Sequence, residues 1–133
     1  MAERVIGTGV DLVENERIRD LLAKWGPHFK SRVFLDSEQS YCDTKAAPWL
    51  YYAGRFAVKE AVSKAFGTGI GPALGWKDIE VVRDTTGAPS VRLSEHGLIL
   101  ARKQGVERIL ISLSHTHHFA VAHALLMGSV PEP

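Results

Sequence analysis

Apolar and polar positions follow two different periods along the chain, and together they predict a mixture of strands and helices. The run Arg4–Leu12 is rich in β-prone apolar residues, and its two glycines, Gly7 and Gly9, fall on one face, which favours a strand. Apolar residues then recur every three or four positions over 14–25. This spacing predicts a helix that ends at Gly26-Pro27.

The longest predicted helix lies in the middle of the chain, over 49–66, and ends where Gly67 opens a glycine-rich loop. Periodicity and turn residues predict shorter elements on either side of it. These are helical segments at 28–34 and at 38–44 (capped by Asp36 or Ser37), strands at 78–83 and 90–93, a helix from Ser94 to about 103, and strands at 108–114 and 119–127. This order predicts an α+β fold, with the long helix packed on an antiparallel sheet in a single domain over 1–127 and a loose tail at 128–133.

Composition narrows the class of protein. A chain of 133 residues suits one domain with a real core, and a net charge of +1 argues against a nucleic-acid binder. The single cysteine, Cys42, excludes an internal disulfide framework and favours a structural thiol over a nucleophile. No secretory signal is visible, and no window holds the roughly 18 apolar residues of a membrane span, so we expect a cytoplasmic protein.

Three charged residues leave two interpretations open. Glu60 and Lys64 stand four positions apart on the long helix, which is typical of a surface ion pair worth about 0.3–0.5 kcal/mol. Asp11, near the end of the first strand, could cap the helix that follows. Alternatively, the two carboxylates could clamp one Mg²⁺, which takes one or two protein carboxylates together with substrate phosphates and water.

The glycine-rich loop at 67–75 differs from a familiar phosphate loop, because it follows its helix and therefore meets the negative helix end. Any phosphate bound there needs cations, and Arg55, Lys59 and Lys64 are near in sequence. The turn His115–His118 lacks a fourth zinc ligand and is predicted to be a solvated hairpin turn, in which His115 alone could meet a phosphate.

Several motifs together give the chain a family resemblance. They are IGTGVDLVENERI, FLDSEQ, AGRFAVKEAVSKAFGTGIG, WKDIEV, DTTGAP and ISLSHTHHFAVA, in this order between about residues 5 and 126. Taken together they resemble holo-acyl-carrier-protein synthase, the small type of 4′-phosphopantetheinyl transferase. Only the segment Cys42–Leu50 has no counterpart in that pattern, and the histidine-rich turn is unusual for it.

The resemblance implies a magnesium-dependent transferase, typically a homotrimer with sites between subunits. The enzyme moves the 4′-phosphopantetheine arm of coenzyme A to a serine of an apo acyl carrier protein, releases 3′,5′-ADP, and supports fatty-acid or polyketide biosynthesis. A non-catalytic nucleotide-binding scaffold and a hydrolase of small phosphates are the competing hypotheses.

The resemblance also implies roles for particular residues. Asp11 and Glu60 become magnesium ligands, and Glu60 and Lys64 become catalytic groups. The implied coenzyme A contacts are Arg55, Lys59, Lys64, Gly67, Thr68, Gly69, Gly87, Pro89, His115 and Thr116. The implied docking face for the carrier protein is Arg17, Leu21 and Arg32.

Overall fold

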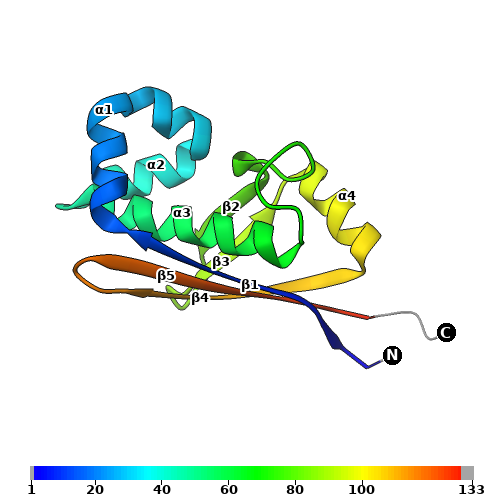
Figure 1. The fold of residues 1–133 in the computed structure, drawn as a ribbon. Helices are drawn as coiled ribbons and strands as arrows, with labels where there is room; N and C mark the ends of the chain where they lie inside the picture. Colours follow the sequence, from blue (N-terminus) through cyan, green and yellow to red (C-terminus); the bar gives the residue numbers. More distant parts are fainter. Residues whose placement is uncertain (1, 130–133) are drawn as a thin grey trace.

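An antiparallel three-stranded sheet forms one side of the protein, and the α-helices cover one of its faces (Figure 1). The computed structural model describes residues 2–129. The sheet has the order β1-β5-β4, formed by β1 (Arg4–Glu14), β5 (Phe119–Gly128) and β4 (Val106–His115). The two edge strands are therefore β1 and β4, and the α+β class is confirmed.

The helix α3 (Pro48–Ala65) packs directly on this sheet, as the sequence predicts. Its contact with β1 depends on Gly7 and Gly9, because a Cβ at either position would collide with the backbone carbonyl of Ala65 or Ala61. The inner face of β5 carries small residues that let the helix approach: Ala120, Ala122 and Ala124. Backbone-to-backbone packing thus fixes how α3 lies over β1.

The helix α1 (Asn15–Val33) unites two predicted helices across a kink at Gly26, whose φ of 44° is one that other residues rarely adopt. Next, α2 (Asp36–Asp43) packs against α3. The predicted capping by Asp36 or Ser37 is wrong: Leu35 occupies the N-cap position, and its N–H donates to the Glu38 carboxylate at 2.8 Å. Glu38, at position N3, therefore makes the half of a capping box that binds the N-cap N–H, and Leu35 has no side-chain acceptor for the other half.

A second, two-stranded sheet completes the fold. The short 3₁₀ turn η1 (Trp76–Asp78) leads into β2 (Ile79–Arg83), which pairs with β3 (Pro89–Leu93). The helix α4 (Glu95–Gln104) is capped by Ser94, as predicted, and ends at Gly105. The predicted tail begins too early, because Gly128 still belongs to β5, and 130–133 lie outside the described residues.

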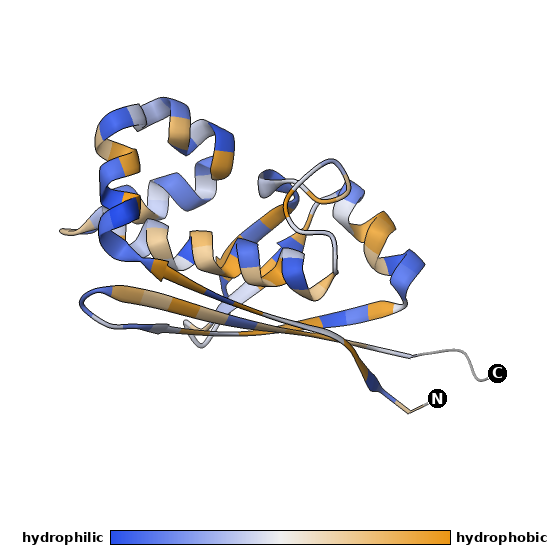
Figure 2. Cartoon of the chain, viewed as in Figure 1, coloured by the Kyte–Doolittle hydropathy of each residue, from blue (hydrophilic) through white to orange (hydrophobic). Residues whose placement is uncertain are grey.

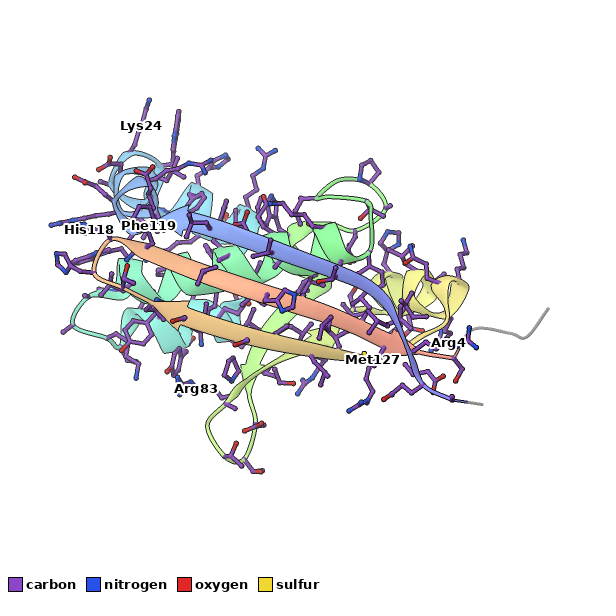
Figure 3. All side chains as sticks on the ribbon, turned by 60° about the horizontal axis from the view of Figure 1, so that its bottom comes forward. Arg4, Lys24, Arg83, His118, Phe119 and Met127 are labelled. Carbon is purple, nitrogen blue, oxygen red and sulfur yellow. The ribbon has the colours of Figure 1, made fainter. Side chains whose placement is uncertain are left out.

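The outer face of the three-stranded sheet is covered by no element of the described chain (Figure 3). Apolar side chains project from it on all three strands, and the most exposed are Val5, Val10, Leu12, Leu110 and Phe119. The strands are rich in apolar residues along their length (Figure 2), and these residues include both exposed and buried side chains. No helix among residues 2–129 is long and apolar enough to cross a bilayer.

Candidate active site

Asp11 and Lys64 meet where β1 passes under the end of α3. The Lys64 ammonium donates to the Asp11 carboxylate at 2.9 Å and to the Val10 carbonyl at 3.2 Å. Asp11 lies within β1, three residues before the N-cap Glu14, so it does not cap α1. The ion pair that forms joins Lys64 to Asp11 across two elements, in place of the local pair with Glu60 that the spacing suggested.

Glu60 lies one helical turn before Lys64 and belongs to the same cluster of charges. Partial burial raises the pKa of its carboxyl, and the nearby negative charge of Asp11 raises that pKa further. The positive charges of Lys64 and Arg17 act in the opposite direction. Two carboxylates held near each other in this way repel, and a cation placed between them relieves the repulsion.

The donor set formed by Asp11 and Glu60 suits magnesium better than a transition metal. Both groups offer hard oxygen ligands, and no cluster of three or more metal-ligating side chains occurs among residues 2–129. A structural zinc site would need such a cluster. Mg²⁺ needs only one or two carboxylates when phosphates and water complete its coordination, so these residues fit that ion.

A second group of polar residues lies around Arg55 on α3. The Arg55 side chain is 6% exposed, stacks over the Tyr41 ring at 4.3 Å, and has a buried Nε without a partner among the described residues. His115 packs against the same helix, because a Cβ on Gly54 would lie 2.7 Å from its ring. Partial burial and the charge of Arg55 lower the pKa of His115, which keeps its imidazole neutral near pH 7.

This second group includes two cations that no motif or spacing marked. Arg83 lies over the Tyr41 ring at 5.0 Å, and Lys45 lies over it at 4.5 Å. Lys45 falls in the Cys42–Leu50 segment that lacks a family counterpart, so no motif marked it. Arg55, Tyr41 and Arg83 also line one surface hollow of about 210 Å³. The grouping is therefore basic, aromatic and accessible from outside.

The two groups lie at opposite edges of the sheet. Asp11 is on β1 and pairs with Ala122 of β5, whereas His115 is on β4 and pairs with Ala120 on the other side of β5. Two strand spacings, about 10 Å, separate the backbones of these edges. On α3, Arg55 and Glu60 are five residues apart and therefore point about 140° away from each other. Within one chain, the two groups face different directions.

Lys59 belongs to neither group. Its side chain is fully buried, forms an ion pair with Glu38 at 2.8 Å, and donates to the carbonyls of Trp76 at 2.9 Å and Ile79 at 2.7 Å. Burial lowers the pKa of Lys59, and the charge of Glu38 works against that shift. An ammonium has three hydrogens, and here all three have partners, so we leave Lys59 out of the ligand-contacting set.

The glycine-rich loop has its first N–H groups committed to the end of α3. The amide of Gly67 donates to the Lys64 carbonyl at 2.9 Å, and those of Thr68 and Gly69 donate to the Ser63 carbonyl at 3.2 and 3.1 Å. These amides are therefore not free for a phosphate in this conformation. In the other predicted loop, Gly87 takes a φ of 87° and donates to Asp84, which orders the exposed turn before Pro89.

Two of the three predicted docking residues lie in the same groove. Arg17 and Leu21 line one groove of about 430 Å³ along α1, with Lys24 and the acidic side chains of Glu14, Glu16 and Asp20. Arg32 lies beyond the kink at Gly26 and is absent from this groove. Lys24, which no motif marked, is the further basic residue on this face.

Comparisons with known proteins identify relatives of this chain. The sequence pattern of the 4′-phosphopantetheinyl transferase superfamily matches residues 7–122. The chain is 43% identical over 120 residues to the holo-[acyl-carrier-protein] synthase of Protochlamydia amoebophila, covering 90% of this chain and 96% of that protein.

Solved structures extend the similarity to three dimensions. The crystal structure of the holo-[acyl-carrier-protein] synthase of Neisseria meningitidis matches with a TM-score of 0.87 at 31% identity, over 92% of this chain and 98% of that one. The Bacillus anthracis synthase in complex with CoA (3′,5′-ADP) matches with a TM-score of 0.79 at 35% identity, over 96% and 100%.

Proposed function

Because this chain belongs to the 4′-phosphopantetheinyl transferase superfamily, we propose that it carries out the reaction of the holo-acyl-carrier-protein synthases. It is an enzyme of that type, with coenzyme A and an apo acyl carrier protein as its substrates. The serine oxygen of the carrier attacks the phosphorus that bears the pantetheine arm. The bond from that phosphorus to the bridging oxygen breaks, and 3′,5′-ADP leaves with the bond's electron pair.

The observation that carries the proposal is the cluster of Asp11, Glu60 and Lys64 at the junction of β1 and α3. Phosphoryl transfer depends mainly on positioning and on stabilising negative charge. Two carboxylates beside one ammonium, on rigid elements, provide sites for a metal ion and for an anionic leaving group. A scaffold that only bound nucleotides would need no such pair of carboxylates.

We infer that the enzyme depends on magnesium held by Asp11 and Glu60. When bound, the ion neutralises diphosphate charge and lowers the pKa of a coordinated hydroxyl. Glu60, with its raised pKa, is suited to accept the serine proton directly or through a water molecule. Lys64 lies one turn further along α3 and stabilises the negative charge on the leaving 3′,5′-ADP.

We further propose that the complete site forms between two copies of the chain within a homotrimer. Asp11, Glu60 and Lys64 would come from one copy, and Arg55, His115 and Thr116 from the next. The opposite placement of the two groups supports this arrangement, and so does the apolar outer face of the sheet, which a second copy would cover. Gly87, in the turn between β2 and β3, and Pro89, the first residue of β3, would close over the nucleotide.

For the carrier protein, we propose docking on the α1 groove through Arg17 and Leu21, with Arg32 further along the helix. Such carriers are acidic around the modified serine, so the attraction should weaken as salt shortens the Debye length from about 10 Å at 0.1 M to 3 Å at 1 M. A fatty-acid carrier or a polyketide carrier could present that acidic surface.

Intact-mass spectrometry of the carrier tests this function directly. The protein is incubated with coenzyme A, magnesium chloride and an apo acyl carrier protein. A gain of one phosphopantetheine on the carrier, and none on a variant whose serine is replaced by alanine, supports transfer. Release of phosphate without a gain in carrier mass would support the hydrolase instead. Bound coenzyme A without either product would support the scaffold.

A further inference from the structure

We propose that Arg17 is a coenzyme A ligand contributed by α1, whose guanidinium binds the diphosphate beside Glu60 and Lys64. The inference rests on the proposed function and assigns a second role to a residue otherwise placed on the carrier-docking face. It makes Arg17 the side chain at which the two substrates meet.

The position of Arg17 follows from its packing on α3. Its Cζ lies 5.8 Å from the centre of the Phe56 ring. Phe56 is one helical turn before Glu60, so both residues lie on the same side of α3. The Phe56 ring also packs against Trp76 at 4.9 Å, which fixes the surface under the guanidinium. Arg17 therefore projects from α1 toward the carboxylate cluster.

The charge of Arg17 is available for a ligand. Although Glu14, Glu16 and Asp20 line the same groove, no carboxylate within residues 2–129 forms an ion pair with its guanidinium. Its guanidinium instead lies over the Phe56 ring, on the side of α3 that carries Glu60. Lys64, the other cation of the cluster, already donates to Asp11.

The chemistry of the diphosphate favours arginine at this place. A guanidinium is always charged and offers a planar set of donors that can bind two phosphate oxygens at once. The departing 3′,5′-ADP gains negative charge during transfer, so a second cation beside Lys64 stabilises it. Because α1 also bears Leu21 and Lys24, the same helix can bind the carrier and bring this cation to the phosphate.

Isothermal titration of coenzyme A in the presence of magnesium, without any carrier protein, tests the inference. Arg17→Met is the main variant, because methionine keeps an apolar stem over Phe56 while it removes the charge. Lys24→Met is the matched control, since Lys24 lies two turns along the same helix and lines the same groove. Loss of a charge-assisted hydrogen bond should weaken coenzyme A binding by about tenfold or more in Arg17→Met. Lys24→Met should bind coenzyme A like the wild type.

Two further results complete the test. Arg17→Lys, which keeps the charge and loses the fork of donors, should restore part of the lost affinity. Coenzyme A binding by Arg17→Met equal to that of the wild type, with a defect confined to the carrier KM, would overturn the inference and leave the proposed function intact. Failure of the wild type to bind coenzyme A would overturn both.

Discussion

Lys64 reaches from α3 to donate a 2.9 Å hydrogen bond to Asp11 on β1, 53 residues away in sequence. The lysine side chain is 49% exposed and the aspartate 14%. An ion pair this open to water contributes only about 0–1 kcal/mol to stability. The stability of the fold is therefore a weaker reason for this arrangement than the phosphoryl transfer proposed for these two residues.

Replacing Lys64 should separate function from stability. Lys64→Ala should change the free energy of unfolding by less than about 1 kcal/mol, because the pair is exposed. It should lower kcat by about 100-fold and raise the KM for coenzyme A, because one preorganised cation at a developing charge is worth that much. Steady-state kinetics against both substrates check this. Lys103→Ala, at the exposed end of α4, is the control and should leave kcat and the KM values unchanged.

Removing either carboxylate of the proposed metal site should abolish transfer without unfolding the protein. Asp11→Asn and Glu60→Gln each keep the shape of the side chain while removing an anionic ligand, so activity should fall at least about 100-fold. Excess magnesium should recover part of the lost activity if Asp11 and Glu60 are the magnesium ligands. Carrier mass and circular dichroism are the readouts, with Glu95→Gln on α4 as control. Near-normal activity of either variant at ordinary magnesium levels would contradict the two-carboxylate assignment.

The raised pKa of Glu60 predicts a stability change with a definite sign. The folded chain holds a proton on Glu60 more tightly than the unfolded chain does, so its negative charge destabilises the fold at neutral pH. Glu60→Gln should therefore raise Tm at pH 7 by about 1–3 °C. The gain should disappear below about pH 4, where glutamate is protonated in both states. If the Tm of Glu60→Gln at pH 7 were equal to or below that of the wild type, it would contradict the raised pKa of Glu60.

The buried pair of Lys59 and Glu38 should be essential to the fold. Lys59→Ala leaves the Glu38 carboxylate buried without its cation, which typically costs about 3–5 kcal/mol, a large part of the roughly 5–15 kcal/mol that stabilises a domain. The double variant Lys59→Met with Glu38→Gln removes both charges and should recover part of the loss. Urea unfolding measures both variants. If Lys59→Ala had normal stability but poor affinity for coenzyme A, Lys59 would again count among the residues proposed to contact coenzyme A.

Mixing two inactive variants tests the site between subunits. Glu60→Gln and His115→Ala damage opposite halves of the proposed site, so co-refolded mixtures should contain some sites built from two intact halves. Activity should return to a fraction of the wild-type value, while each variant alone stays inactive. Leu12→Asp, on the uncovered sheet face, is the control for assembly and should give a monomer in light scattering. A wild-type monomer at micromolar concentration would refute the arrangement.

Local patterns in the sequence predict the elements well, because periodicity and turn residues act over short distances. The long helix, the hairpin at the end of the chain and the break at Gly26 all follow from neighbouring residues. The start of α2 at Leu35 was missed, because leucine has no capping side chain and its N–H is bound by Glu38, three residues further on.

Local sequence patterns do not predict contacts between elements that are distant in the chain. Spacing paired Lys64 with Glu60, whereas the fold brings Asp11 to it from another strand. Spacing also placed Lys59 with the surface cations, because helical periodicity does not reveal which side meets α2 and β2. Lys45 and Arg83 were missed for the same reason, since their grouping around Tyr41 exists only in three dimensions.

The close approach of β1 to α3 has a consequence for anyone who scans this protein by mutation. Gly7 and Gly9 bear no functional group, yet any side chain there would push the strand off the helix that carries Glu60 and Lys64. In a selection for growth, both positions would therefore look as intolerant as the active-site positions. Measuring the amount of folded protein would distinguish positions needed for folding from positions needed for activity. Alanine at either glycine should lower the amount of folded protein, whereas Asp11→Asn should leave the folded protein abundant but inactive.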